Sequence, residues 1–207
     1  MAPASIRDAV PDDYDAFARF FAQLHAPEQV PSARVYEELV APRAFFGVES
    51  GLPSAFLCWR PEGAVFHVSI LAVLPERRRR GLGRHLMLEA ARRGRAHGFT
   101  RWQLHVAIDN AAAQPLYEQL GMAVVSENVL LDLDADLAVR LSAIRLGSPH
   151  VHVVGRFGEA APAVGNDGSP VRVVVQGDAA FANELRAAGG AVVHRTLTMC
   201  GEMPESP

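Results

Sequence analysis

The sequence predicts an α/β protein, because strand-like and helix-like segments alternate along most of the chain. The apolar run at residues 65–74 ends at Pro75 and predicts a central strand, and the run at 84–97 predicts the helix that follows it. A strand at 100–108 and a helix at 111–120 repeat this order. With 49% hydrophobic and 21% charged residues, the composition is typical of a folded globular protein.

The other predicted elements of the first 133 residues rest on apolar spacing and on turn residues. They are a strand at 5–10, a helix beginning at Pro11, a helix at 31–40, strands at 44–49 and 54–60, and a final strand pair at 123–125 and 129–133. Within the helix at 111–120, Pro115 places the regular start near Gln114, because proline is tolerated in the first turn of a helix.

An arginine- and glycine-rich turn joins the strand at 65–74 to the helix at 84–97. Its residues are Arg78, Arg79, Arg80, Gly81, Leu82 and Gly83. Backbone N–H groups at such a turn, beside glycines that let a ligand approach closely, make a cradle for an anion. The Gly-x-x-x-x-Gly-Lys-Ser/Thr pattern is missing, so the turn predicts pyrophosphate binding without a P-loop lysine. The alternative is a glycine-rich turn beside a solvated run of arginines.

Together with a second block, this turn resembles the signatures of the GCN5-related N-acetyltransferase (GNAT) family. Residues 71–87 are similar to the family's acetyl-CoA motif, in which Arg/Gln-x-x-Gly-x-Gly/Ala follows a strand with a Val-x-Pro-like end. Residues 110–122 are similar to its Asn-x-x-Ala-x-x-Leu-Tyr-Glu-x-x-Gly-Phe signature. The two blocks occur in the family's order and at its normal separation, and the resemblance covers residues 6–133.

The resemblance implies the family's fold, a mixed and mostly antiparallel sheet flanked by helices, and acetyl-CoA as the acetyl donor. In that fold the central strand splays from the next strand, and its backbone binds the pantetheine arm. The residues that the resemblance assigns to acetyl-CoA are Leu71, Ala72 and Val73 on this strand, Arg78, Arg79, Arg80, Gly81, Leu82, Gly83 and Arg84 in the turn, and Asn110 before the next helix. Arg78 has a structural role as its alternative, and Asn110 can also cap the helix.

Acetyl transfer from a thioester to an amine needs a base for the ammonium proton and an acid for the leaving thiolate. Tyr117 matches the family tyrosine that protonates the coenzyme A thiolate; the alternative is a tyrosine packed on a helix face. His67 lies eleven residues before Arg78, where members of the family carry a catalytic Glu or His. An imidazole accepts a proton at neutral pH. Strand alternation puts four residues on one face: Val65, His67, Ser69 and Leu71.

Other titratable residues offer weaker candidates. A strand histidine that only hydrogen-bonds to a neighbour is the alternative for His67, and His105 on the next strand is a second candidate base. No His, Cys, Asp or Glu residues have the spacing of a metal site, so no metal is expected. Cys58 lies in an apolar run and predicts a buried thiol, and together with Cys200 it makes no disulfide framework.

Charge and hydropathy limit the classes of partner. The net charge of −3 gives no indication of nucleic-acid binding, and the anion cradle already accounts for the arginines at 77–80. All 20 basic residues are arginine, so the protein cannot acetylate itself on a lysine. The apolar runs are too short to span a bilayer, and no apolar leader-like run follows the first residues. We therefore expect a cytoplasmic protein without a membrane or nucleic-acid partner.

The C-terminal part has no cofactor motif of its own. We expect a GNAT domain at 1–133 and an α/β extension at 134–207, with strands at 151–157, 171–176 and 191–199 and helices at 134–146 and 179–188. An offset of 68 residues aligns Gly121 and the apolar run after it with Gly189 and a similar run, so the extension is either a degenerate half-repeat or an unrelated addition. Its apolar strands need cover, either from the catalytic domain or from a second chain in a homodimer.

These observations predict an acetyl-CoA-dependent N-acetyltransferase that acts on the primary amine of a small molecule by direct attack in a ternary complex. Two alternatives stay open: a peptide or protein amine as the acceptor, and a protein that binds an acyl-CoA without transferring the acyl group. The acceptor itself cannot be inferred from the sequence, because the segments that would contact it carry no known code.

Overall fold

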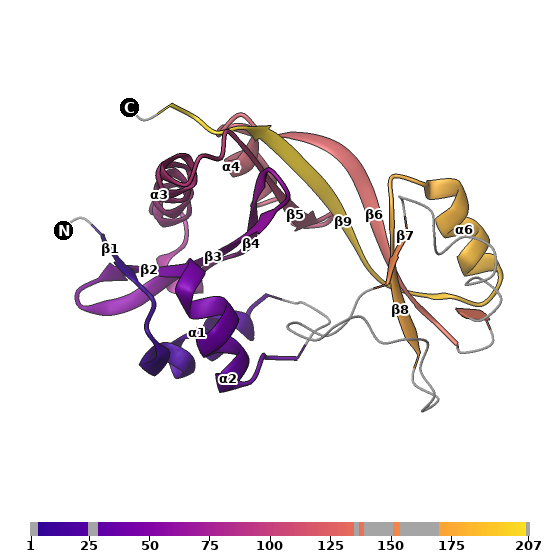
Figure 1. The fold of residues 1–207 in the computed structure, drawn as a ribbon, viewed down its shortest axis with the longest axis horizontal. Helices are drawn as coiled ribbons and strands as arrows, with labels where there is room; N and C mark the ends of the chain where they lie inside the picture. Colours follow the sequence, from indigo (N-terminus) through magenta and orange to yellow (C-terminus); the bar gives the residue numbers. More distant parts are fainter. Residues whose placement is uncertain (1–3, 25–28, 135–136, 139–150, 154–169, 206–207) are drawn as a thin grey trace. The chain divides into compact units, whose positions relative to one another are not determined.

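The computed structural model describes residues 4–24, 29–134, 137–138, 151–153 and 170–205 (Figure 1). The strands are β1 (Ser5–Asp8), β2 (Ala44–Glu49), β3 (Leu52–Glu62), β4 (Val65–Val73), β5 (Arg101–Ala107), β6 (Ala123–Leu133), β7 (Val151–Val153), β8 (Val171–Gln176) and β9 (Ala191–Glu202). The α-helices are α1 (Tyr14–Phe21), α2 (Ala33–Val35), α3 (Leu82–Ala96), α4 (Gln114–Glu118) and α6 (Ala179–Ala187). Short 3-10 or π turns lie at Pro11–Asp13, Tyr36–Val40, Ala41–Arg43 and Pro75–Arg77.

The chain divides into two compact units, and neither is continuous in sequence. The first comprises Met1–His105, Ala111–Ala123 and Met199–Pro207, and the second comprises Val106–Asn110 and Val124–Thr198. Strands β5 and β9 therefore contribute residues to both units. The expected division between residues 133 and 134 stays a prediction.

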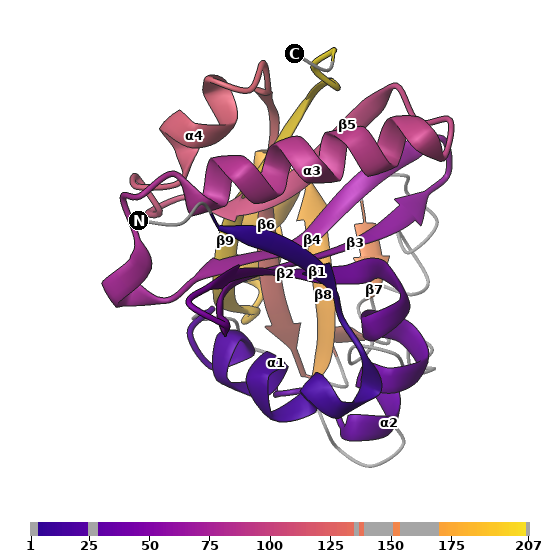
Figure 2. The ribbon, with the colours of Figure 1, turned by 90° about the vertical axis from the view of Figure 1, so that its left-hand side faces the viewer.

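The sheet of the first unit is mixed and mostly antiparallel, as the predicted fold requires. Its strand order is β1-β2-β3-β4-β5, followed by the end of β9. Neighbours from β1 to β4 pair antiparallel, whereas β4 and β5 pair parallel. Parallel strands need a long crossover, and α3 supplies it (Figure 2).

Two helices cover opposite faces of this sheet (Figure 1). On one face, the rings of α1 pack against strand aromatics, with Phe17 5.5 Å from Phe56 and Phe20 5.9 Å from Phe46 between centroids. On the other face, Leu86 of α3 lies so close to β2 that a Cβ on Gly47 would meet its Cδ1 at 2.8 Å. The helices predicted at 11–24 and 84–97 thus form the two outer layers.

A β-bulge in β4 changes which face its residues occupy. Cys58 pairs with Ile70, but the next residue, Trp59, pairs with Val68, so Ser69 is the extra residue. The expected alternation, with Val65, His67, Ser69 and Leu71 on one face, is therefore wrong beyond Ser69. Leu71 and Val73 instead lie near the start of α3, within 4 Å of an added Cβ on Gly83.

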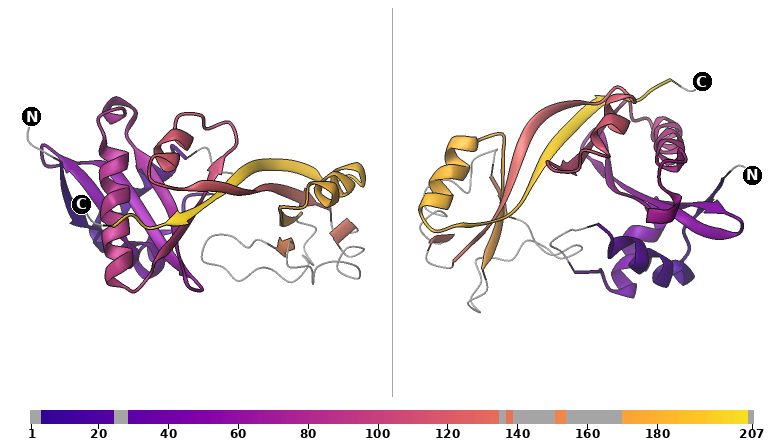
Figure 3. Two further views of the ribbon diagram at one scale, coloured as in Figure 1. Left: turned by 90° about the horizontal axis from the view of Figure 1, so that it is seen from above. Right: turned by 180° about the vertical axis from the view of Figure 1, so that it is seen from behind.

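The second unit has its own hydrophobic core, and its strands continue the nine-stranded sheet. The strand order is β9-β6-β8-β7, and β8 pairs antiparallel with both β6 and β7 (Figure 3). Apolar side chains of β6 and β8 pack with α6 in one cluster. Its members are Leu131, Leu133, Leu137, Ala138, Val151, Val171, Val173, Val175, Phe181, Ala182 and Leu185. Within the described residues the extension is thus an α/β element with a hydrophobic core.

Local geometry repeats at an offset of 68 residues, as the half-repeat interpretation predicts. Gly121 after α4 has φ +80°, and Gly189 after α6 has φ +110°. The backbone hydrogen bonds that end the two helices also match: Gly121 N to Glu118 O with Gly189 N to Arg186 O, and Met122 N to Tyr117 O with Gly190 N to Leu185 O. Each helix leads into a long strand, β6 or β9, and these two strands are neighbours in the sheet.

Most predicted elements are present, with shifted ends. The strand pair predicted at 123–125 and 129–133 is wrong, because β6 runs without a break from Ala123 to Leu133. Helix α4 begins at Gln114 with Pro115 in its first turn, as predicted. The helix predicted at 134–146 and the loop at 158–170 lie almost entirely outside the described residues.

Candidate active site

The turn before α3 has the geometry of an anion cradle. Arg79 and Gly81 have positive φ angles of +62° and +82°, and α3 begins immediately afterwards at Leu82. No side chain caps this helix, and its first internal bond runs from His85 N to Gly81 O at 2.9 Å. The N–H groups of the first turn therefore make no bonds within the helix, and they lie at the positive end of a 15-residue dipole. This arrangement fits a diphosphate.

The arginines of the turn differ in their contacts. Arg78 donates from Nε to the carbonyl oxygen of Val73 at 3.1 Å, which is the structural alternative considered for it. Arg77 lies 3.5 Å from Glu49. Arg79, Arg80 and Arg84 have exposed side chains, and Gly81 is exposed as well. Positive charge thus surrounds the open end of α3.

Residues 71–73 lie where β4 separates from β5. Pairing between these parallel strands runs from Val65 and Arg101 to Val68 and Leu104. Beyond that point, β4 continues to pair with β3 alone within the described residues. One edge of the backbone at Leu71, Ala72 and Val73 is therefore available to an extended arm, although Arg78 occupies the carbonyl of Val73.

Helix α4, which carries Tyr117, packs on the start of α3. A Cβ added to Gly83 would meet Cδ2 of Leu116 at 3.3 Å, so α4 packs on the start of α3 (Figure 2). Only 7% of the surface of Tyr117 is exposed. Burial raises the pKa of its phenol to about 12, so Tyr117 carries its proton at neutral pH.

His67 is a buried member of a polar cluster on the face of the sheet opposite α3. The cluster comprises Arg60, Glu62, His67, Ser69, Gln103, His105 and Cys200. His67 is 3% exposed, and its Nδ1 lies 3.2 Å from Oε2 of Glu62 and 3.4 Å from Nε2 of Gln103. The ring of His105 stands edge-on to it, with centroids 5.1 Å apart. Polar side chains from three neighbouring strands therefore surround this imidazole.

Burial controls the charge of His67. Desolvation lowers its pKa to about 2, and the positive charge of Arg60 and the neighbouring His105 act in the same direction. Desolvation also lowers the pKa of His105, with the carboxylate of Glu62 opposing the shift. His67 is therefore a neutral imidazole that can accept a proton but does not hold one at rest.

Asn110 does not cap α4. The N-cap residue of that helix is Ala113, three positions later, so the capping alternative is wrong. The side chain of Asn110 is exposed, and its backbone N–H donates to Ala107 O at 3.0 Å. Asn110 belongs to the second unit, and its contact with the cofactor stays a prediction.

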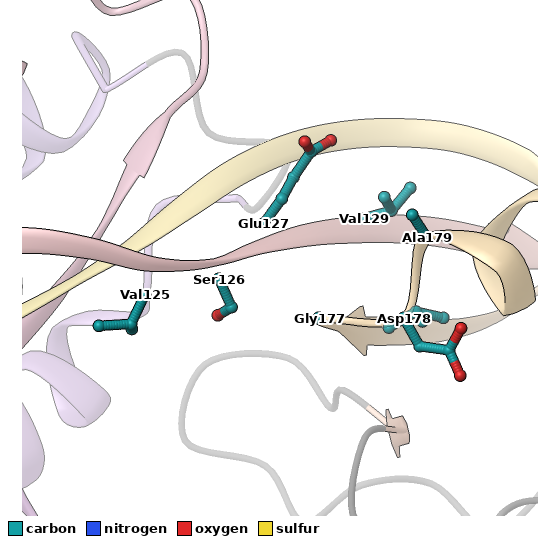
Figure 4. Close-up of a pocket in the computed structure, with 8 residues that line it drawn as sticks. Val125, Ser126, Glu127, Val129, Gly177, Asp178 and Ala179 are labelled. Atoms are coloured by element: carbon teal, nitrogen blue, oxygen red, sulfur yellow. The ribbon is translucent and has the colours of Figure 1, made fainter.

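The second unit has a hollow of about 170 Å³ where β6 meets the turn between β8 and α6 (Figure 4). Two acidic residues line it, Glu127 and Asp178. Asp178 caps α6 by accepting a hydrogen bond from Phe181 N at 2.9 Å. Because the helix end is capped and the lining is acidic, this hollow is unsuited to a pyrophosphate.

The described residues show neither a metal site nor a membrane-spanning helix. They contain no group of three or more His, Cys, Asp or Glu that could hold a metal ion. None of the helices in the described segments is long and apolar enough to cross a bilayer.

Sequence reasoning missed the polar partners of His67. Glu62 and Gln103 were not singled out, because neither belongs to a motif. A signal for Glu62 does exist: the turn at 61–63 places it on the strand that pairs with the His67 strand, and Arg60 lies directly opposite His67. Gln103 lies opposite His67 in the parallel pair, a register that spacing alone does not reveal.

Comparison with known proteins identifies the class. The model of the acetyltransferase (GNAT) family matches residues 10–122, more than half of the chain. The chain therefore belongs to the GNAT family and is an N-acetyltransferase that uses acetyl-CoA as its donor. No curated protein is similar enough in sequence to count as a relative.

Solved structures agree with this assignment. A GCN5-related N-acetyltransferase from Sphaerobacter thermophilus has a TM-score of 0.71 at 17% identity, over 99% of this chain and 97% of that one. The ribosomal-protein-S18-alanine N-acetyltransferase of Escherichia coli has a TM-score of 0.50 at 18% identity, over 99% and 96%. N-acetylglutamate synthase of Neisseria gonorrhoeae, solved with coenzyme A and L-arginine, has a TM-score of 0.52 at 17% identity, over 60% and 28%. At these identities the likeness is one of fold.

Proposed function

We propose that this acetyltransferase transfers the acetyl group to the primary amine of a small molecule, by direct attack within a ternary complex. The observation that supports the proposal is the packing of α4, the helix that carries the buried, protonated Tyr117, on the uncapped start of α3. A donor bound at the cradle would have its thioester near an acid. This is the arrangement that acyl transfer from a thioester requires.

The donor would bind in two parts. Backbone N–H groups from Arg79 to Arg84 would hold the pyrophosphate, and the free edge of β4 at residues 71–73 would hold the pantetheine arm. The positive φ of Gly81 supports the first part, because it turns the backbone so that a helix can begin with its N–H groups open. The end of β4–β5 pairing after Val68 supports the second part.

His67 and Tyr117 would each take part in one proton transfer. His67 takes a proton from the ammonium group, through a water because its ring is 97% buried. The amine nitrogen attacks the thioester carbonyl carbon; the C–N bond forms, the C–S bond breaks, and Tyr117 gives its proton to the thiolate. The second amine proton leaves to solvent, and solvent exchange restores both side chains. The net products are the amide, coenzyme A and one proton.

Burial of the base favours a slender acceptor. Because His67 is 3% exposed, a primary amine on a small molecule could approach it more closely than an amine on the surface of a folded protein could. The alternative is a peptide amine, and the fold likeness to the S18-alanine N-acetyltransferase is what favours it. Both acceptors would use the same donor site and the same Tyr117.

A coenzyme A release assay tests the acceptor class. Polyamines, arylalkylamines, amino acids, aminoglycosides and peptides would be compared at equal concentration, with Tyr117→Phe as the control for background hydrolysis. We expect at least one small amine to saturate the enzyme with a higher kcat/KM than any peptide. Higher kcat/KM for peptides would transfer the assignment to a peptide amine.

A further inference from the structure

We propose that Glu62 is a positioning residue for His67: it accepts the Nδ1 proton of the imidazole and thereby leaves Nε2 as the proton-accepting nitrogen. This inference rests on the proposed role of His67 in the transfer reaction. Glu62 and His67 lie on the neighbouring strands β3 and β4, and Glu62 belongs to no sequence motif of the chain.

Glu62 is held in place as a carboxylate. Arg60 lies two residues before it on β3 and donates to its Oε2 at 3.2 Å, and Arg60 also donates to Oγ of Ser69 at 3.0 Å. An ionised carboxylate only accepts hydrogen bonds. Its neighbour Nδ1 of His67, at 3.2 Å, must therefore carry a proton.

Because the neutral ring carries a single proton, the position of that proton also determines the state of the other nitrogen. Because burial keeps His67 neutral, one nitrogen carries the proton and the other has a free lone pair. If Glu62 holds the proton on Nδ1, then Nε2 is the acceptor. In other enzymes a buried carboxylate selects the tautomer of a catalytic histidine in the same way.

Gln103 and Cys200 fit this tautomer when the amide of Gln103 is turned over. As placed, Nε2 of Gln103 faces Nδ1 of His67 at 3.4 Å, and Cys200 donates to Oε1 at 3.7 Å. The oxygen and nitrogen of a side-chain amide are similar in size, so hydrogen bonding decides which of the two faces a neighbour. In the turned orientation Oε1 shares the single Nδ1 proton with Glu62, and the amide N–H group donates to the sulfur. The last neighbour of the ring, His105, contacts it edge-on. A histidine ring does not replace the Glu62 carboxylate as the charged acceptor for the Nδ1 proton.

The tautomer can be measured directly. In ¹⁵N-labelled protein at pH 7.5, the ring nitrogens of His67, assigned by comparison with His67→Gln, should show a protonated Nδ1 and an unprotonated Nε2. Glu62→Ala should lose this preference, and Glu62→Asp should retain it. Glu62 is half exposed, so both variants should fold as the parent does, which circular dichroism checks.

Kinetics supply the second readout. With the best acceptor, Glu62→Ala should lower kcat by about 10²-fold, the lower end of what a single acid–base group contributes, and leave the KM for acetyl-CoA unchanged. Glu62→Asp should recover part of the loss. The matched control is Glu127→Ala, because Glu127 is also a strand glutamate paired with an arginine, Arg195, at 2.8 Å, but lies in the second unit. It should retain the parent kcat.

Two results would overturn the proposal. One is a parent spectrum with the proton on Nε2 of His67, and the other is a Glu62→Ala variant with parental tautomer and parental kcat. The spectrum does not depend on any acceptor. If no small amine is acetylated, the proposed function fails, whereas the tautomer result still decides the role of Glu62.

Discussion

Burial moves the two titratable side chains of the site in opposite directions. It raises the pKa of Tyr117 to about 12 and lowers that of His67 to about 2. In both cases the charged form is the one that loses its water, so both side chains are neutral at rest. Tyr117 therefore has a proton to give and His67 has a free lone pair, and the same burial makes Tyr117 a weaker acid and His67 a weaker base than in water.

Removal of the Tyr117 hydroxyl tests the donor role. Tyr117→Phe keeps the ring that packs in α4 and deletes the proton. We expect kcat to fall by about 10²–10⁴-fold, the usual contribution of one acid–base group, while acetyl-CoA affinity measured by calorimetry stays unchanged. A phenylalanine variant with the parental kcat would make Tyr117 a packing residue.

The pKa of His67 also makes stability depend on pH. The folded protein holds this imidazole neutral to about pH 2, whereas the unfolded chain protonates it near pH 6.5. Its contribution to stability is therefore present above pH 6.5 and is lost as the pH falls. Between pH 6.5 and 4.5 the loss is about 2 kcal/mol, since one pKa unit corresponds to about 1.4 kcal/mol.

Urea unfolding at pH 7.5, 6.5, 5.5 and 4.5 measures this loss. The control is His67→Gln, which cannot titrate and should lose about 2 kcal/mol less than the parent between pH 6.5 and 4.5. Parallel stability profiles for the two proteins would show that His67 is solvated in the folded state.

At the scale of the element, the motifs predicted where helices and strands lie along the chain, and the pairing of strands in the sheet corrected some of these predictions. Helix α3 begins at Leu82, two residues before the start that the sequence indicated, and the anion cradle at this turn stays a prediction. The face of the sheet on which the β4 residues after Ser69 lie could not be predicted, because a bulge within an apolar run has no signature in the sequence. The continuity of β6 could not be predicted either. The polar residues Ser126, Glu127 and Asn128 lie between the two predicted strands, but β6 continues through them with β9 and β8 as its neighbours.

The end of β9 has a specific packing role in the first unit. Met203, just beyond the strand, is 2% exposed and lies against Gly94 of α3, where a Cβ would collide with it. Arg95 of α3 donates to the carbonyl oxygens of Met203 and Pro204. This contact anchors the chain end to the helix that carries the cradle.

Met203→Ala should therefore destabilise the protein by about 2–5 kcal/mol, the range for truncation of a buried methionine. Equilibrium unfolding in urea measures the change, with the exposed Leu52→Ala as a control that should cost less than about 1 kcal/mol. A cost for Met203→Ala no larger than that of the control would mean that the chain end does not pack on α3.

At the scale of the whole molecule, the two units are interleaved along the chain. The family motifs predicted a catalytic domain that ends at residue 133, because all of them lie before it. That division stays a prediction. The first unit includes Met199–Pro207, and an alignment of local motifs cannot show that a strand so distant belongs with it. Side-chain pairs such as Gln103 with Cys200 depend on that distant strand and were equally beyond prediction.

A chain that ends at Asp134 should consequently lose more than an appendage. It lacks the end of β9, including Met199 and Met203, which are 0% and 2% exposed. We expect poor solubility and no cooperative unfolding transition, measured by thermal circular dichroism. A chain shortened only to Glu205 should behave as the parent. A stable, active chain that ends at Asp134 would contradict the role given to β9.

Among the described residues, the helices α3 and α6 differ at their N-termini. Helix α3 starts without a side-chain cap, whereas Asp178 caps α6 and adds a negative charge. The helix of the extension is therefore capped and carries no anion cradle, and the half-repeat origin of the extension stays a prediction. We expect one acetyl-CoA per chain.

Calorimetric titration with acetyl-CoA is the most direct test of the central claim that the Arg79–Arg84 turn holds the donor. The parent should bind one molecule per chain. Gly81→Ala adds only the strain of a left-handed residue, since open space surrounds the added Cβ, and should still bind. Gly81→Glu places a negative charge at the cradle and should abolish binding while the fold survives. Binding of parental affinity by Gly81→Glu, or two molecules bound per chain, would contradict the account.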